Sequence, residues 1–158
     1  MIRSLGVFAC ICLVCYSVAV AQTPAGTHSL IEFRAARMTP APGYRLVKSM
    51  GDTNYYVADI AIVSDDDIAD ARADTNALNG LVIEIRLKPP ATSRLHRFTQ
   101  RHLKQRLALF LNGELSGTPA LIVSPVKEEA LTLEVGRPAG LNAPQFAAAI
   151  ATRWHPGP

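Results

Sequence analysis

RLALFLNGEL, residues 106–115, places an Asn-Gly pair between two apolar runs. Asn112 and Gly113 both tolerate positive φ, which a tight two-residue turn requires, and the apolar flanks supply two strands for the turn to join. The stretch therefore predicts an antiparallel hairpin with its turn at these two residues.

A helix is expected directly before this hairpin, over residues 92–105. Pro89 and Pro90 end the preceding strand, and the apolar side of the helix carries Leu95, Phe98 and Leu103. Basic residues at steps of three and four form the opposite side: Arg94, Arg97, Arg101 and Lys104. Such a stripe is most often only a solvated face, but it is also a candidate contact for a partner or an anionic surface.

Further upstream, residues 81–87 alternate as a half-buried strand does, after a turn at Asn79-Gly80. Residues 55–63 are rich in strand formers and end at an acidic run. Beyond that run, the residues at 68–73 favour a short helix, with Ser64 or Asp65 as its cap.

Downstream, residues 121–123 and 131–135 predict two more strands, and residues 145–153 a last helix. Runs of consecutive strands with short turns favour an α+β fold, in which an antiparallel β-sheet is covered on one face by helices. We expect residues 55–154 to form this domain. Residues 22–54 are expected to be a flexible segment with at most one edge strand, at residues 30–33.

The N-terminus has the order of a secretory signal peptide: Arg3, then an apolar run over residues 5–20, then small residues at Ala19 and Ala21. We expect residues 1–21 to be removed before Gln22, which makes the protein periplasmic or secreted. The alternative is a chain anchored to the membrane by an uncleaved or lipidated N-terminus.

The mature chain of residues 22–158 would contain no cysteine, since all three cysteines lie at or before position 15. Disulfides and thiol chemistry are then excluded, and stability has to come from burial. The net charge of +3 falls to +2 without Arg3, which argues against a nucleic-acid partner. We expect no stable transmembrane segment after cleavage.

The quoted stretch also resembles a known family. Phe98-Thr99, the run from Arg106 to Leu115 and the segment from Pro119 to Ile122 are similar to the periplasmic P1 head subdomain of the SecD/SecDF protein-export subunit. Tyr56-Val57, the run from Ser64 to Ile68, and Gly136 before an Ala-rich helix follow in the matching order. The resemblance spans residues 55–153 and implies a SecDF P1-head-like fold.

Some positions depart from the pattern of that family. His102 and Lys104 stand where Asn and Gly are common, Gln105 stands for a Lys, and Asn112 for the Asp of the hairpin turn. SecD couples export to the proton gradient through membrane helices with ionisable residues. We expect this chain, which would lack them, not to act as that motor.

No motif in the chain indicates catalysis or metal binding. The acidic run at 65–67, with Asp70 and Asp74, lacks the ligand spacing and the central Gly of a calcium loop. The histidines His28, His96, His102 and His155 are scattered, and no nucleophile elbow is present. We expect no catalytic residue, no metal site and no cofactor.

The sequence therefore favours an exported, non-catalytic interaction domain that binds polypeptide or a cell-envelope protein. The candidate contacts are the basic stripe and the loop Ser116-Gly117-Thr118-Pro119, where interrupted strands would leave backbone groups near Ser116 and Thr118 free to pair with an extended peptide. Two alternatives stay open. One is a small periplasmic enzyme, which a carboxylate and a histidine in a deep pocket would favour, and the other is a soluble regulator of the export translocase.

Cleavage after Ala21 is directly testable. Small side chains at Ala19 and Ala21 fit signal peptidase, so amino-terminal sequencing of the exported form by mass spectrometry should begin at Gln22. A start at Met1 or at a lipidated cysteine would contradict this prediction.

Overall fold

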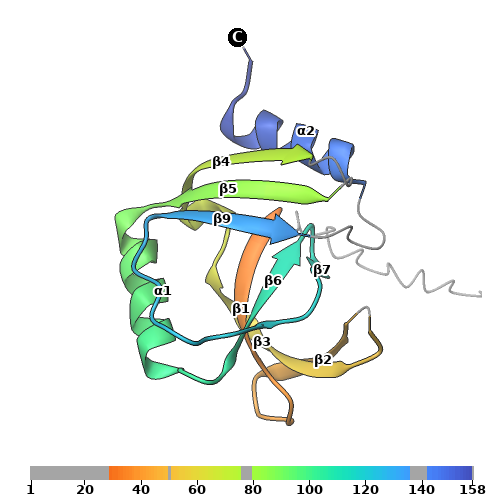
Figure 1. Ribbon diagram of the computed structural model, residues 1–158, viewed down its shortest axis with the longest axis vertical. Helices are drawn as coiled ribbons and strands as arrows, with labels where there is room; N and C mark the ends of the chain where they lie inside the picture. Colours follow the sequence, from red (N-terminus) through yellow and green to blue (C-terminus); the bar gives the residue numbers. More distant parts are fainter. Residues whose placement is uncertain (1–28, 50, 76–79, 136–141, 158) are drawn as a thin grey trace, which may run out of the picture.

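The computed structural model describes residues 29–49, 51–75, 80–135 and 142–157. Figure 1 shows these residues arranged as two antiparallel sheets with two helices. The expected α+β fold is confirmed, and the strands are divided between two sheets.

The larger sheet has the strand order β2-β3-β1-β6-β7, and β8 also pairs with β6. Its strands are β1 (Ile31–Arg37), β2 (Tyr44–Lys48), β3 (Asn54–Val63), β6 (Arg106–Leu111), β7 (Glu114–Leu115) and β8 (Ala120–Leu121). The smaller sheet has the order β4-β5-β9, with β4 (Ile68–Thr75), β5 (Leu81–Leu87) and β9 (Ala130–Val135). The helices are α1 (Pro89–Arg101) and α2 (Ala143–Trp154).

The predicted hairpin joins β6 to β7. Asn112 and Gly113 have φ of 51° and 82°, so both central residues adopt the positive φ that a tight hairpin turn needs. Phe110 pairs with Leu115 and Leu111 with Glu114 across the turn. This prediction is confirmed.

The prediction of at most one edge strand before residue 55 is wrong, because two strands, β1 and β2, lie there. β1 is in the middle of the larger sheet, paired with β3 on one side and β6 on the other. Ile31 and Phe33 are buried there. Long-range pairing of this kind leaves no local signal, because Pro24, Gly26, Pro40 and Pro42 around the strand make the segment resemble a loop.

The predicted helix at residues 68–73 is wrong, because these residues form the strand β4. A short 3₁₀ turn at Asp65–Asp67, capped by Ser64, comes before the strand. A β-bulge between Ile68 and Asp70 shifts the alternation by one residue, so the buried side chains are Ile68 and Ala71. That spacing of three mimics one face of a helix.

α1 begins and ends earlier than predicted. Pro89 and Pro90 occupy its first turn, where proline is tolerated because the first N–H groups have no helical partner. The helix ends at Arg101, so Leu103 lies beyond it and is 46% exposed instead of buried. Thr99 fills the inward position, with no exposed surface.

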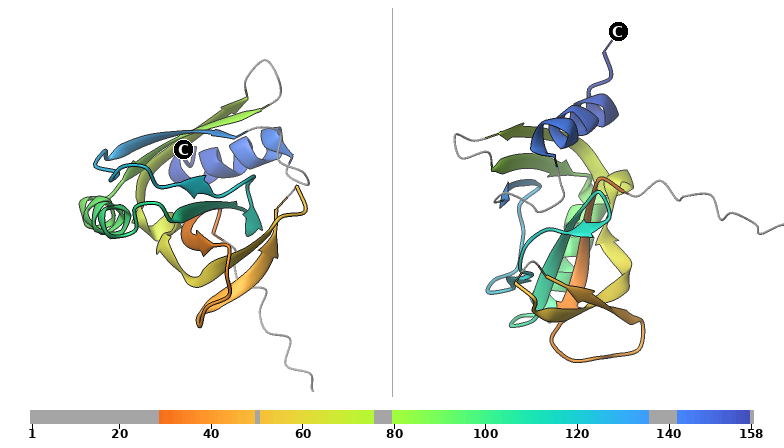
Figure 2. Two further views of the ribbon diagram at one scale, coloured as in Figure 1. Left: turned by 60° about the horizontal axis from the view of Figure 1, so that its bottom comes forward. Right: turned by 90° about the vertical axis from the view of Figure 1, so that its right-hand side faces the viewer.

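Both helices bury apolar side chains in one core cluster between the sheets. The alternating residues of β5 supply its centre: Leu81, Ile83, Ile85 and Leu87. α1 adds Ala91 and Leu95, and α2 adds Phe146 and Ile150. Figure 2 shows α2 lying along the smaller sheet, at the opposite end of the molecule from the loop between β1 and β2.

Two sequence predictions concern segments outside the described residues: the cleavage site at Ala19, Ala21 and Gln22, and the turn at Asn79-Gly80, of which Asn79 is not described. Within the described residues, no helix is long and apolar enough to cross a membrane.

Replacing Gly113 with Val should destabilise the fold by about 1–2 kcal/mol, because a β-branched side chain is strained at φ of 82°. Thermal unfolding measures this loss. The control is Gly51→Val, because Gly51 has no positive φ and nothing lies within 4 Å of an added Cβ. Equal melting temperatures for the two variants would contradict the assignment of strain to this turn.

Candidate functional site

An apolar groove of about 480 Å³ lies where β9 faces β6 and the segment after the hairpin. Leucines from both strands line it, with Phe33 and Leu95 behind them. Its complete lining is Phe33, Leu95, Leu107, Leu109, Ser116, Gly117, Thr118, Ala120, Val126, Leu131, Thr132, Leu133, Glu134 and Val135. A single carboxylate among these residues makes the lining nearly uncharged.

Strand alternation places the leucines. On β6, Leu107 and Leu109 pack against the central core, whereas Ala108 and Phe110 belong to a second cluster, so successive side chains point to opposite faces. On β9, Leu131, Leu133 and Val135 are half-buried against the same core. β9 is an edge strand of the smaller sheet, so one side of its backbone has no strand partner in that sheet.

A buried threonine fixes the far wall of the groove. The Thr99 hydroxyl donates to the Leu95 carbonyl at 2.9 Å and accepts the Val126 N–H at 2.9 Å. His96 Nδ1 lies 3.1 Å from the Val126 carbonyl. These contacts hold the otherwise irregular segment around Val126 against α1, and no sequence signal identified Val126 as a site residue.

The predicted loop Ser116-Gly117-Thr118-Pro119 lies at this groove, and its first three residues line it. The Ser116 N–H, however, donates to the Leu109 carbonyl at 2.8 Å, so this backbone group is not free as the sequence suggested. The Ser116 hydroxyl is buried and has no hydrogen-bond partner among the described residues. Pro119 is buried, and its carbonyl accepts a bond of 3.0 Å from Arg106.

The four residues of the predicted basic stripe do not form one continuous face of α1. Arg94 donates to the Ile62 carbonyl at 2.7 Å and forms an ion pair with Asp67. Arg97 and Arg101 are exposed on α1, while Lys104 lies beyond the helix in a turn with φ of 66°. None of the four lines the groove, so the two predicted contact regions do not form one site.

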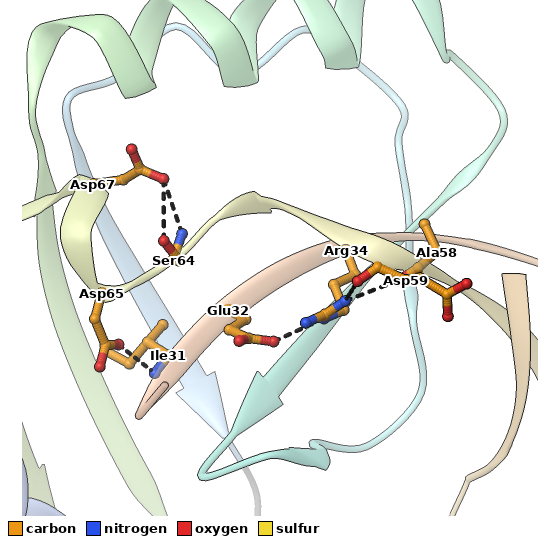
Figure 3. A network of polar contacts seen from close by, with 8 residues as sticks. All are labelled: Ile31, Glu32, Arg34, Ala58, Asp59, Ser64, Asp65 and Asp67. Carbon is orange, nitrogen blue, oxygen red and sulfur yellow. Dashed lines mark hydrogen bonds and ion pairs between the residues drawn. The ribbon is translucent and has the colours of Figure 1, made fainter. Parts of the chain in front are cut away.

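The acidic run has structural partners. Asp65 accepts the N–H groups of Leu30 and Ile31, each at 2.9 Å. Figure 3 shows the bond from Ile31, and also the bond of 3.0 Å that Asp67 accepts from the Ser64 N–H. Among the described residues, no three His, Cys, Asp or Glu side chains are grouped to hold a metal ion. These carboxylates therefore hold β1 and the 3₁₀ turn together.

Among the described residues, a histidine forms an ion pair with a carboxylate at one place, away from the groove. His155 Nε2 lies 3.0 Å from Asp70 and 3.1 Å from the Ala71 carbonyl, which attaches the end of α2 to β4. Both side chains are at least a third exposed. This pair lies at the surface, whereas the proposed enzyme alternative calls for such a pair in a deep pocket.

The family "SecDF, P1 head subdomain" matches residues 44–150, more than half of the chain. The chain belongs to this family. The resemblance seen in the sequence is thus confirmed, and the P1 head family relates the chain to protein export.

Two solved SecDF structures share the fold of this P1 head domain. A structure of SecDF, "a membrane component" that "enhances protein export", has 18% sequence identity and a TM-score of 0.55 over 84% of this chain and 64% of that chain. SecDF "in Super-membrane-facing form" has 18% identity and a TM-score of 0.54 over 84% of this chain and 19% of that chain. The chain thus spans less than two thirds of either. A comparison with curated proteins finds no match.

The ion pair between Asp67 and Arg94 makes stability depend on pH. Burial would raise the pKa of Asp67, but the hydrogen bond from Arg94, the Ser64 N–H and the charge of Arg94 together lower it below the ordinary 3.8. A lowered pKa in the folded state stabilises the fold above the pKa of the unfolded state, and this contribution is lost as the pH falls through the folded value.

Arg94→Met should therefore destabilise the P1 head domain by about 1 kcal/mol at pH 7, and by much less near pH 2. Urea unfolding at pH 7, 5, 3 and 2 measures the difference. The control is Arg97→Met on the same helix, which is exposed and should change little at any pH. A pH-independent loss for Arg94→Met would contradict the charge-based account.

Proposed function

We propose that this P1 head domain is a non-catalytic binding module of the cell envelope that holds an extended polypeptide in the apolar groove. The observation that carries the proposal is the position of β9, an edge strand whose leucines line the groove opposite Leu107 and Leu109. An extended chain added beside such a strand gains backbone hydrogen bonds, and its alternate side chains enter the groove.

The chemistry of the lining supports an apolar peptide. Leucine and valine side chains dominate it, and they gain free energy when they exclude water against apolar partners. Glu134 is the single titratable side chain in the lining, and no histidine accompanies it. This composition favours binding over acid–base catalysis, which uses paired titratable groups.

The cellular setting is part of the proposal. In the family, the P1 head faces the periplasm, and a leader over residues 1–21 would bring this chain to the same side of the membrane. A domain over residues 55–154, completed by β1 and β2, would then meet polypeptides during or after export.

The test is binding of a dye-labelled seven-residue peptide with Leu or Val at alternate positions, followed by fluorescence anisotropy. Thr118→Trp should lower the affinity at least tenfold, because Thr118 is exposed at the groove and a large side chain there obstructs it. Leu133→Glu should do the same by placing a charge in the lining.

Two controls make the result specific. Ile60→Glu adds the same charge at a position on β3 that is 83% exposed and outside the groove, and should leave affinity unchanged. A peptide methylated on alternate backbone nitrogens should bind weakly, because it cannot pair with β9. Equal binding by the methylated peptide, or by both groove variants, would refute strand addition at this groove.

A further inference from the structure

A second surface combines exposed apolar side chains with cations at one end of the larger sheet, toward the lower end of Figure 1. Three segments meet there: the end of β1, the turn after α1, and β8 with the residues that follow it. Arg37 and Met38 line a small hollow together with Lys104 and Arg106. The Lys104 N–H donates to the Ile122 carbonyl at 2.9 Å, and the Ile122 N–H to the Gln105 carbonyl at 2.8 Å.

Large apolar side chains project from this end. Four of the six exposed large apolar side chains in the described part of the chain belong to these three segments: Met38 (54%), Leu103 (46%), Leu121 (50%) and Val123 (80%). Ile122, between two of them, is only 6% exposed, so strand alternation turns its neighbours outward. We call these four residues and the cations beside them the basic tip.

The charge of the basic tip has one sign. Arg37, Arg101, Lys104 and Arg106 lie in or beside the three segments, and no Asp or Glu occurs in residues 33–51, 85–113 or 115–127. Arg106 is tied to the Pro119 carbonyl, whereas Arg101 and Lys104 form no ion pair with any described residue. Two cations are therefore free to contact an anion.

We propose that the basic tip docks on the anionic phospholipid headgroups of a bilayer, with Leu103, Leu121 and Val123 entering the interface. Apolar insertion and attraction to anionic lipids together give interfacial binding, and this end of the molecule supplies both. A protein partner would need hollows matched to these projecting side chains. A bilayer interface accepts them without such a match, because lipid tails rearrange around them.

The experiment places a fluorescent reporter at the basic tip. Val123→Trp adds a second tryptophan to the chain, at the basic tip. The signal of the native Trp154, on α2, is measured in the unaltered chain. Vesicles of phosphatidylcholine with 30% phosphatidylglycerol carry brominated acyl chains, which quench only inserted tryptophan. We expect quenching with these vesicles, weaker quenching with phosphatidylcholine alone, and loss of quenching at high salt.

Two variants serve as comparison. Ile60→Trp places the reporter at an equally exposed position away from the basic tip and should not be quenched. Adding Arg101→Glu and Lys104→Glu to the Val123→Trp chain should lower the apparent affinity for the vesicles about 25-fold or more, since each cation near an anionic surface contributes about fivefold. All chains share one N-terminus, so any membrane attachment through it is common to them.

Equal quenching of Val123→Trp and Ile60→Trp would overturn the proposal, as would binding unaffected by the charge reversals. If poly-glutamate shifts the Val123→Trp emission and anionic vesicles do not, the surface serves an acidic polypeptide and the lipid assignment is wrong. Because the peptide groove shares no residue with the basic tip, peptide affinity should be unchanged in the charge-reversed chain, so each proposal can fail alone.

Discussion

The carboxylate of Asp65 binds two consecutive backbone N–H groups at the start of β1, and the arrangement of the two sheets depends on this contact. Asp65 lies in the short turn through which the chain leaves β3 of the larger sheet and enters β4 of the smaller one. By accepting from Leu30 and Ile31, it ties that crossing point to the central strand of the larger sheet. Asp67, in the same turn, binds Arg94 and so fixes α1 to the crossing. Two of the three acidic residues at 65–67 thus help to join the layers (Figure 3).

The central strands of the larger sheet serve two different environments. On one face, Leu107 and Leu109 meet the main core and line the groove.

On the other face of the larger sheet, Phe110 packs with Tyr55 and Val57. The guanidinium groups of Arg34 and Arg45 each lie 5.8 Å from the centroid of the Phe110 ring. Arg34 is held there by Glu32 and by the carbonyls of Ala58 and Asp59. Cations over an aromatic face cover an apolar cluster while remaining partly hydrated, which closes the second face of the sheet without another layer.

The sequence predicts the helices and strands that are specified by residues close to one another in the chain. The Asn112-Gly113 hairpin, the strands β5 and β9 and the last helix are predicted correctly. Turn-forming residues and hydrophobic periodicity are both visible within a few residues of sequence. β1 is predicted only as a short edge strand and β4 as a helix, for physical reasons. The strand partners of β1 lie 19 to 80 residues away in the chain, and a bulge gives β4 a helical spacing. For the site, the sequence identified the loop at Ser116–Thr118 but not Val126, whose position depends on a hydrogen bond to Thr99. A wall built by pairing across 27 residues leaves no local motif.

The net charge of +3 led to the exclusion of nucleic acid, yet the structure shows that the charge is unevenly distributed. Carboxylates gather at the turn between the sheets, while the three segments of the basic tip carry none. A local excess of cations alone would suit any polyanion. Proteins that bind single-stranded nucleic acid add aromatic side chains on which bases stack, whereas the exposed apolar residues of the basic tip are aliphatic. Aliphatic side chains cannot stack on a base as an aromatic ring does, but they gain free energy when they enter hydrocarbon. The side-chain chemistry, more than the charge, therefore separates a lipid surface from a nucleic acid as the anion that this end of the molecule would meet.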